Sequence, residues 1–139
     1  MIEAQKAAFK LEKFKIPNFS YTESNSPDIS IIFTPSGKYF QNKGVFELKL
    51  DFLGVEAANK DKATITVSCI AYFKFEEPIA FSDIPKYFYI NSIAIVFPYL
   101  RSFVSTLTLQ ANTGLMILGL FNLSNLEDEL KGNTECIIE

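Results

Sequence analysis

Two neighbouring stretches of this chain have apolar residues at every second position, which restricts it to folds built on an antiparallel sheet; in the second stretch, Ile70 and Tyr72 interrupt the polar face and suggest a second contact surface. In 46–52 every second residue is apolar, and the residues between are charged: Glu47, Lys49 and Asp51. In 65–75 a second apolar face has the same period of two. This period is typical of strands with one buried face. The polar segment 58–62 between them predicts a hairpin connection.

Two further strands are expected upstream. Apolar residues alternate in 9–16 but change parity after Leu11, which predicts a bulge or bend in this strand. After a polar loop at 21–28, residues 29–34 alternate as a second strand. The turn chemistry of 35–38 (Pro-Ser-Gly-Lys) predicts that this strand ends there.

A long helix is predicted at 91–110, after an aromatic-rich connector at 79–89, because apolar residues recur there with the spacing i, i+3, i+4, i+7. Pro98 lies inside this pattern and predicts a kink, since proline removes a helical hydrogen bond at a cost of about 3 kcal/mol. Arg101 is the only charged residue of the segment, so its apolar face is broad. Such a helix needs more partner surface than a small domain usually offers, which points to assembly.

The end of the chain is expected to form an apolar crossover and a short helix. Gly114 suits the left-handed position beyond a helix, and 115–121 is a run without charge. The short helix, capped by Asn122 or Ser124, carries three leucines: Leu123, Leu126 and Leu130. Strands come first and helices last, which predicts an α+β fold: a four-stranded antiparallel sheet, a long kinked helix, an apolar crossover loop and a short C-terminal helix.

Composition excludes several classes of protein. The chain has 139 residues, enough for one domain with its own core, and 48% are apolar, too many for a disordered chain. Its net charge is −3 without a basic block, so nucleic-acid binding is not expected. The N-terminus lacks the apolar core of a signal peptide, and apolar runs stay short of the ~20 residues that span a bilayer. We expect a single cytoplasmic domain, 1–139, without membrane insertion.

The sequence contains no histidine, which rules out catalytic triads, Cys–His pairs and most zinc sites. The carboxylates at 76–77 and 127–129 fit a solvated strand end and a solvated helix face better than acid–base pairs. Cys69 lies in an apolar strand pattern and Cys136 in the tail, so both are expected to be free thiols. The chain is therefore not expected to be an enzyme, and no cofactor or metal is implied.

The order of these elements, together with a few specific residues, resembles the SecB family of export chaperones. The resemblance rests on Phe97-Pro98-Tyr99 followed by Arg101, after four predicted strands and before an apolar crossover. Ser105, Leu107 and the segment 118–122 support it. It covers nearly the whole chain.

The resemblance implies an ATP-independent holdase, a chaperone that keeps unfolded clients, commonly preproteins awaiting export, in long apolar grooves. Family members pair subunits through their sheets, and two dimers pack through the long helices into a homotetramer. The helix positions expected at that interface are Val96, Phe97, Leu100, Arg101, Phe103, Val104 and Leu107. The positions that match the client groove are Ile29, Ile31, Phe33, Ile117, Leu118, Leu120, Phe121, Leu123 and Leu126. Because unfolded clients expose mixed apolar side chains, a groove of this kind recognises them without sequence detail.

Three departures set this chain apart from the family pattern. Gly119 and Phe121 stand in the crossover, where the family usually has prolines. The positions that match acidic contacts to the export translocase ATPase are Leu11, Lys15 and Thr66, and the tail that also contacts that ATPase is short. Client holding therefore follows from the resemblance more directly than docking to this ATPase. A dedicated client, such as an antitoxin, is the alternative to preproteins.

Two other classes of protein also fit the residues. In a structural adaptor, the apolar stretches would serve only burial between subunits. In a small-molecule carrier, the phenylalanine-rich sheet and helix would enclose a lipid-like ligand. Each proposed groove residue can equally be ordinary core.

Overall fold

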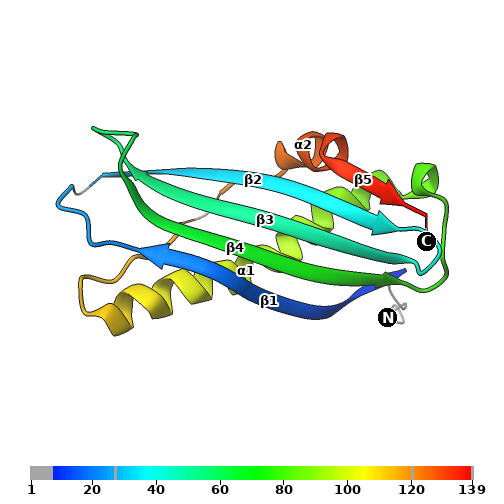
Figure 1. Cartoon of the computed structure of the whole chain (residues 1–139), viewed down its shortest axis with the longest axis horizontal. Coiled ribbons are helices and arrows are strands. Elements are labelled where there is room, and N and C mark those ends of the chain that lie inside the picture. Colours follow the sequence, from blue (N-terminus) through cyan, green and yellow to red (C-terminus); the bar gives the residue numbers. More distant parts are fainter. Residues whose placement is uncertain (1–7, 27, 120, 139) are drawn as a thin grey trace, which may run out of the picture.

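The alternating segments form a five-stranded sheet with one helical layer, as a computed structural model shows for residues 8–26, 28–119 and 121–138 (Figure 1). From one edge to the other, the strands are β1 (Phe9–Tyr21), β4 (Ala63–Phe75), β3 (Val45–Glu56), β2 (Ile29–Phe40) and β5 (Thr134–Ile137). The long helix α1 (Lys86–Ala111) runs diagonally behind the sheet, and α2 (Leu126–Gly132) lies beside β2 and β5. The α+β prediction is confirmed, with one strand more than expected.

The additional strand β5 pairs in parallel with the end of β2. It follows α2 directly, and Asn133 between them donates from Nδ2 to the carbonyl of Pro35 at 3.0 Å. A tail of this length carries too little periodicity to predict a strand. β5 pairs with β2 because α2, which directly precedes it, ends beside β2.

The predicted change of parity in β1 is confirmed as an irregular register against β4. The pairing shifts between Leu11 and Lys13, and again between Lys15 and Asn18. The strand nevertheless continues through Pro17 to Tyr21. Because β1 is an edge strand, a missing proline donor is tolerated there.

The turn predicted at 35–38 is wrong, because β2 continues through it to Phe40. Pro35 tolerates this position because β5 pairs with β2 only from Gly37 onward, so the outer side of Pro35 needs no strand donor. Gly37 is selected by packing, since a Cβ atom there would lie 2.6 Å from Cζ of Phe46. The turn occurs instead at 41–44, where Gly44 has a φ of 65°.

Helix α1 begins at Lys86, earlier than predicted, and takes up the aromatic residues assigned to the connector. It runs without interruption past Pro98, whose side chain is on the exposed side of the helix. The left-handed C-cap residue of the helix is Asn112, with a φ of 58°, and Gly114 two residues further on also has a positive φ, 106°. The short helix α2 is likewise preceded by Asn125 as its cap residue, instead of Asn122 or Ser124.

The core lies between the sheet and α1 and is rich in aromatic rings. Phe88 is fully buried in this core, with its ring centroid 4.8 Å from those of Phe9 and Phe46 and 4.9 Å from that of Phe75. Cys69 is also buried, which raises the pKa of its thiol to about 12, with a smaller contribution from the Asp51 carboxylate. This thiol stays protonated at neutral pH and is a core residue, not a nucleophile.

Candidate functional site

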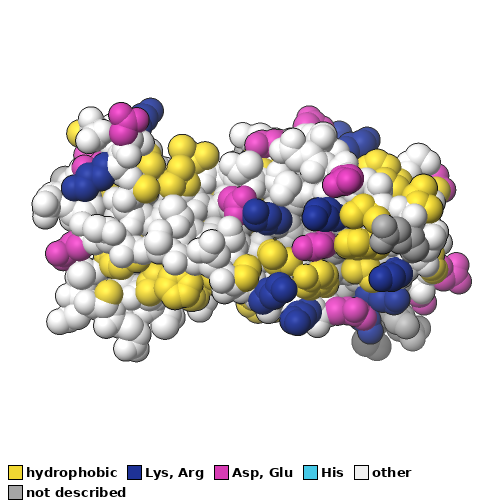
Figure 2. All heavy atoms as spheres, in the orientation of Figure 1, with side chains coloured by type: hydrophobic (Ala, Val, Ile, Leu, Met, Phe, Trp, Pro, Cys, Tyr) yellow, Lys and Arg dark blue, Asp and Glu magenta, His cyan; other side chains and the backbone are white. Residues whose placement is uncertain are grey.

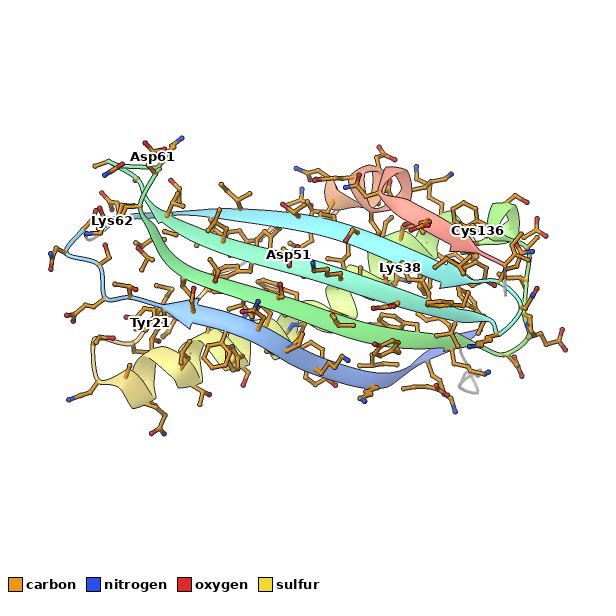
Figure 3. The ribbon with its side chains drawn as sticks, in the orientation of Figure 1. Tyr21, Lys38, Asp51, Asp61, Lys62 and Cys136 are labelled. Carbon is orange, nitrogen blue, oxygen red and sulfur yellow. The ribbon has the colours of Figure 1, made fainter. Side chains whose placement is uncertain are left out.

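Segments far apart in the sequence enclose an open hollow of about 530 Å³ where β1 ends and β2 begins. We call it the crossover hollow, since the segment 113–119 between α1 and α2 forms one wall. The other wall is formed by the first residues of β2 and by four residues that precede them: Glu23, Ser24, Ser26 and Asp28. Tyr21, at the end of β1, points toward the end of α1 (Figure 3), and its hydroxyl lies 2.6 Å from Oγ1 of Thr113.

Most of the proposed groove residues meet at this hollow. Its lining includes Ile29, Ile31, Ile117, Leu118 and Phe121. They differ in exposure: Ile117 is 70% exposed and Phe121 is 39% exposed, whereas Leu118 is only 5% exposed and belongs to the core. The hollow therefore presents apolar surface on both walls.

The remaining groove residues lie beside the hollow or outside the described part of the chain. The ring of Phe33 packs at 5.5 Å from that of Phe121 and 5.7 Å from that of Phe97. Leu123 and Leu126 are partly buried against the core. Leu120 is outside the described residues.

Two hydroxyl groups of α1 hold the crossover in place. The backbone N–H of Met116 donates to Oγ1 of Thr108 at 2.9 Å, and its carbonyl accepts from Oγ of Ser105 at 3.2 Å. Thr108 is fully buried and also donates to the carbonyl of Val104 at 2.9 Å. Both polar groups of one crossover residue are thus satisfied by the helix, which fixes the wall that carries Ile117.

Thr108→Val is therefore expected to loosen the crossover. It removes the acceptor of the Met116 N–H while keeping the shape of the side chain, and an unsatisfied buried donor costs about 1–3 kcal/mol. Urea unfolding should report this loss, and amide hydrogen exchange at 113–119 should become faster. Thr106→Val is the matched control, because Thr106 is exposed on the same helix. Equal exchange in the two variants would contradict this anchoring role.

Gly54 and Thr108 were not among the residues predicted from the sequence, and Ser105 entered only as support for the family resemblance. A Cβ atom at Gly54 of β3 would lie 2.8 Å from Cγ2 of Ile65 and 3.2 Å from Cγ2 of Ile29, so only glycine lets these side chains close over the sheet. A glycine inside a strand pattern was the available signal. Thr108 and Ser105 gave no such signal, because their roles depend on a segment that returns from elsewhere.

The loop wall is held by polar contacts and carries negative charge. Oγ of Ser24 donates to Oε1 of Glu56 at 2.7 Å, and the amide of Ala57 donates to the carbonyl of Asp28 at 3.0 Å. The charged residues among the described lining are Glu23 and Asp28. Thr64 also lines the hollow, and its buried Oγ1 has no hydrogen-bond partner among the described residues.

The residues predicted at a subunit interface lie mostly on the side of α1 that faces the sheet. Val96, Phe97, Leu100 and Val104 are buried against the core of their own subunit. Phe103 and Leu107 are partly buried, and the guanidinium of Arg101 lies 4.9 Å from the centroid of the Phe97 ring. The exposed side chains of α1 from Tyr87 to Leu109 are uncharged. They include several large apolar ones: Tyr87, Ile95, Tyr99 and Leu109.

The outer face of the sheet, away from α1, is mixed in character. In Figure 2 charged side chains of both signs gather mainly over the right half, with apolar patches between them, and further apolar patches lie on the left half. Lys38 and Asp51 both project from this face (Figure 3), and Asp51 accepts from Oγ of Ser68 at 2.6 Å. Nζ of Lys15 in β1 lies 5.6 Å from the Tyr72 ring centroid.

Known proteins resemble this arrangement of sheet, helix and crossover. The SecB-like chaperone Rv1957 of Mycobacterium tuberculosis, solved in complex with a ChAD peptide from the HigA1 antitoxin, superposes with a TM-score of 0.66 over 83% of this chain and 88% of that chain. The chain has a SecB-like fold. At 16% sequence identity the likeness concerns the fold, and it confirms the resemblance predicted from Phe97-Pro98-Tyr99 and Arg101.

A sequence comparison also finds a relative of this chain. An uncharacterised protein of Methanocaldococcus jannaschii is 34% identical over 80 residues, which are 55% of this chain and 51% of that protein. The match therefore spans about half of the relative's length. No protein-family model matches the chain.

Within the SecB-like fold, α1 also differs from the expectation that apolar segments are too short to cross a membrane. Its 26 residues are long and apolar enough by length and composition alone. Core helices of soluble proteins pass the same test, and one side of α1 packs against the sheet through its buried residues: Phe88, Tyr89, Ile93, Val96, Phe97, Leu100 and Val104. This packing favours a core helix over a membrane span.

Proposed function

We propose that this chain is an ATP-independent holdase that keeps unfolded client segments bound at the crossover hollow. The observation that carries the proposal is the exposure of Ile117 and Phe121 on the wall opposite Ile29 and Ile31. Apolar side chains left in solvent around a hollow gain free energy when an apolar segment covers them. The SecB-like structural neighbour, solved with an antitoxin peptide, supports a polypeptide as the occupant.

Dedicated clients in the cytoplasm are the proposed class, with an antitoxin as one example. The positions expected to contact the export ATPase are Leu11, Lys15 and Thr66, and none is acidic. Leu11 is partly buried against the core, and Thr66 is paired with Ser20 through their hydroxyls at 2.6 Å. Preprotein export is the second candidate, supported by the resemblance of the sequence to the export chaperones.

The same proposal includes assembly into a dimer of dimers through the exposed side of α1. That side offers large apolar residues without charge, which is typical of a surface covered by another subunit. A hollow of about 510 Å³ beside it, lined by Phe9, Tyr87 and Ile95 among others, provides room for side chains of a partner. The partner proposed for this surface is a second copy of the chain.

Ile117→Asp is expected to abolish most holding activity. The wild-type chain should suppress aggregation of a chemically denatured, unrelated protein at near-stoichiometric amounts without ATP. Losing the burial of one isoleucine costs about 1.5–3 kcal/mol, so the variant should bind clients about ten- to a hundredfold more weakly. Light scattering during dilution from denaturant measures this directly.

Ile138→Asp is the matched control, since Ile138 is 68% exposed in the tail, away from the hollow. It should hold clients like the wild type, and both variants should retain the wild-type thermal unfolding curve. The holdase proposal fails if the wild-type chain does not suppress aggregation. The assignment to the crossover hollow fails if the two variants behave alike.

A further inference from the structure

The edge of β2 beside the crossover hollow has backbone groups that no strand of the described residues pairs with. β5 pairs with β2 only from Gly37 to Phe40. The N–H groups of Gly37 and Gln41 donate to this side, at 3.3 Å to Asn133 and 3.0 Å to Ile137. Backbone groups alternate between the two sides of a strand. The N–H and carbonyl groups of Ile29, Ile31 and Phe33 therefore point away from β3, to the same side as those of Gly37.

The hydrogen bonds to β3 confirm this parity. The carbonyl of Asp28 accepts from Ala57 on the β3 side, so even-numbered residues of β2 bond inward and odd-numbered ones outward. The unpaired stretch ends at Pro35, which has no N–H and whose carbonyl accepts from Asn133. Residues 29–33 are therefore a short free edge, bounded on one side by the loop and on the other by Pro35.

This edge lacks the features that usually protect a strand from pairing with another chain. Such edges carry lysine, proline or inward charges, or are covered by other elements. Between Ile29 and Thr34 there is no charged residue and no proline, and Ile32 is 47% exposed on the outer face. An edge left open in this way is suited to strand addition.

The side chains of the same residues face the hollow. Ile29 and Ile31 line it, and the Phe33 ring contacts Phe121 on the crossover wall. A strand added along this edge would direct every second side chain into the same layer, beside Ile117 and Phe121. Backbone pairing and apolar burial would thus be supplied by the same short segment.

We propose that a client segment binds in extended form as an added strand on the free edge of β2, continuing the row that β5 begins. This inference rests on the proposed holdase function and specifies its mode of binding. An extended polypeptide is the occupant because only a peptide backbone matches alternating donors and acceptors at the spacing that β5 already uses. The segment spans about five residues, with apolar side chains at alternate positions. The acidic rim at Glu23 and Asp28 disfavours carboxylates at its end.

Backbone N-methylation of a synthetic peptide tests this mode. The probe alternates phenylalanine or isoleucine with threonine and carries lysine at both ends. Two variants of this peptide (the twins) are N-methylated on the backbone: the first at the apolar positions, the second at the threonines. In a strand pair only one set of amides faces β2, so one twin should bind like the parent and the other about tenfold or more weakly.

Amide hydrogen exchange by NMR gives the second readout on the intact protein. Peptide binding should slow exchange at Ile29, Ile31 and Phe33 and leave Ile32 and Thr34, which already bond to β3, unchanged. If the peptide binds but both twins match the parent, or both are equally weakened, strand addition is wrong while the holdase proposal stands. Protection of the three amides before peptide is added, rising with protein concentration, would assign the edge to a second copy of the chain. Absence of peptide binding while aggregation suppression persists would also overturn the inference.

Discussion

Phe88→Ala is expected to remove about 3–5 kcal/mol from the free energy of unfolding, the usual cost of truncating a buried phenylalanine. The Phe88 ring is fully buried where the first turn of α1 meets the sheet, and it contacts rings from β1, β3 and β4. The cavity would lie among aromatic side chains that are held by their own strands, so collapse around it is limited. Since small domains are stable by about 5–15 kcal/mol, this is a large share of the total.

Chemical denaturation followed by circular dichroism measures the effect. Phe19→Ala is the matched control, because Phe19 is 49% exposed on β1 and its truncation should cost less than about 1 kcal/mol. Similar losses for both variants would mean that the burial of Phe88 does not decide the cost.

The sequence predicted best those elements whose partners are adjacent in the chain. Apolar residues occupy every second position of β3 and β4, and the hairpin between these strands follows from local polarity, so both strands are predicted correctly. The end of β2 was misplaced because Pro35 and Gly37 have turn chemistry, whereas their strand positions depend on β5 and on the Phe46 ring. Such long-range pairings leave no periodic signal in the residues themselves.

The same limit applies to the candidate site. Family resemblance identified Ile29, Ile31 and Ile117, and the fold brings these residues to one hollow. The crossover is held there by hydroxyls of Thr108 and Ser105, and nothing local in the sequence indicates that these hydroxyls bond to Met116. Residues that position a site through backbone bonds to a distant segment become visible only in the structure.

The breadth of the apolar pattern on α1 has a simple structural cause. One side of the helix covers the sheet, and the other is exposed yet uncharged from Tyr87 to Leu109. In the sequence, the apolar residues of both sides add up to one broad apolar pattern, so the two sides cannot be told apart. The residues named from that face are therefore mostly core, and the surface that we propose for a neighbouring subunit centres on Ile95 and Tyr99.

Ile95→Asp and Val96→Asp, adjacent on α1, should fail in different ways. Ile95 is 37% exposed, so an aspartate at this position stays solvated in a single subunit. If the α1 helices of two subunits pack together, the same carboxylate is buried without a hydrogen-bond or ion-pair partner. Native mass spectrometry should show folded, smaller species, with a dissociation constant raised about a hundredfold or more.

Val96 is fully buried, so Val96→Asp places a carboxylate in the core of one subunit and should lower the free energy of unfolding by about 4 kcal/mol or more. Circular dichroism separates the two outcomes, because only Val96→Asp should lose the folded signal at moderate denaturant. A folded Ile95→Asp variant that keeps the wild-type mass at all concentrations would exclude this side of α1 as the subunit interface. A folded Val96→Asp variant that dissociates would instead place the interface on the side first predicted from the sequence.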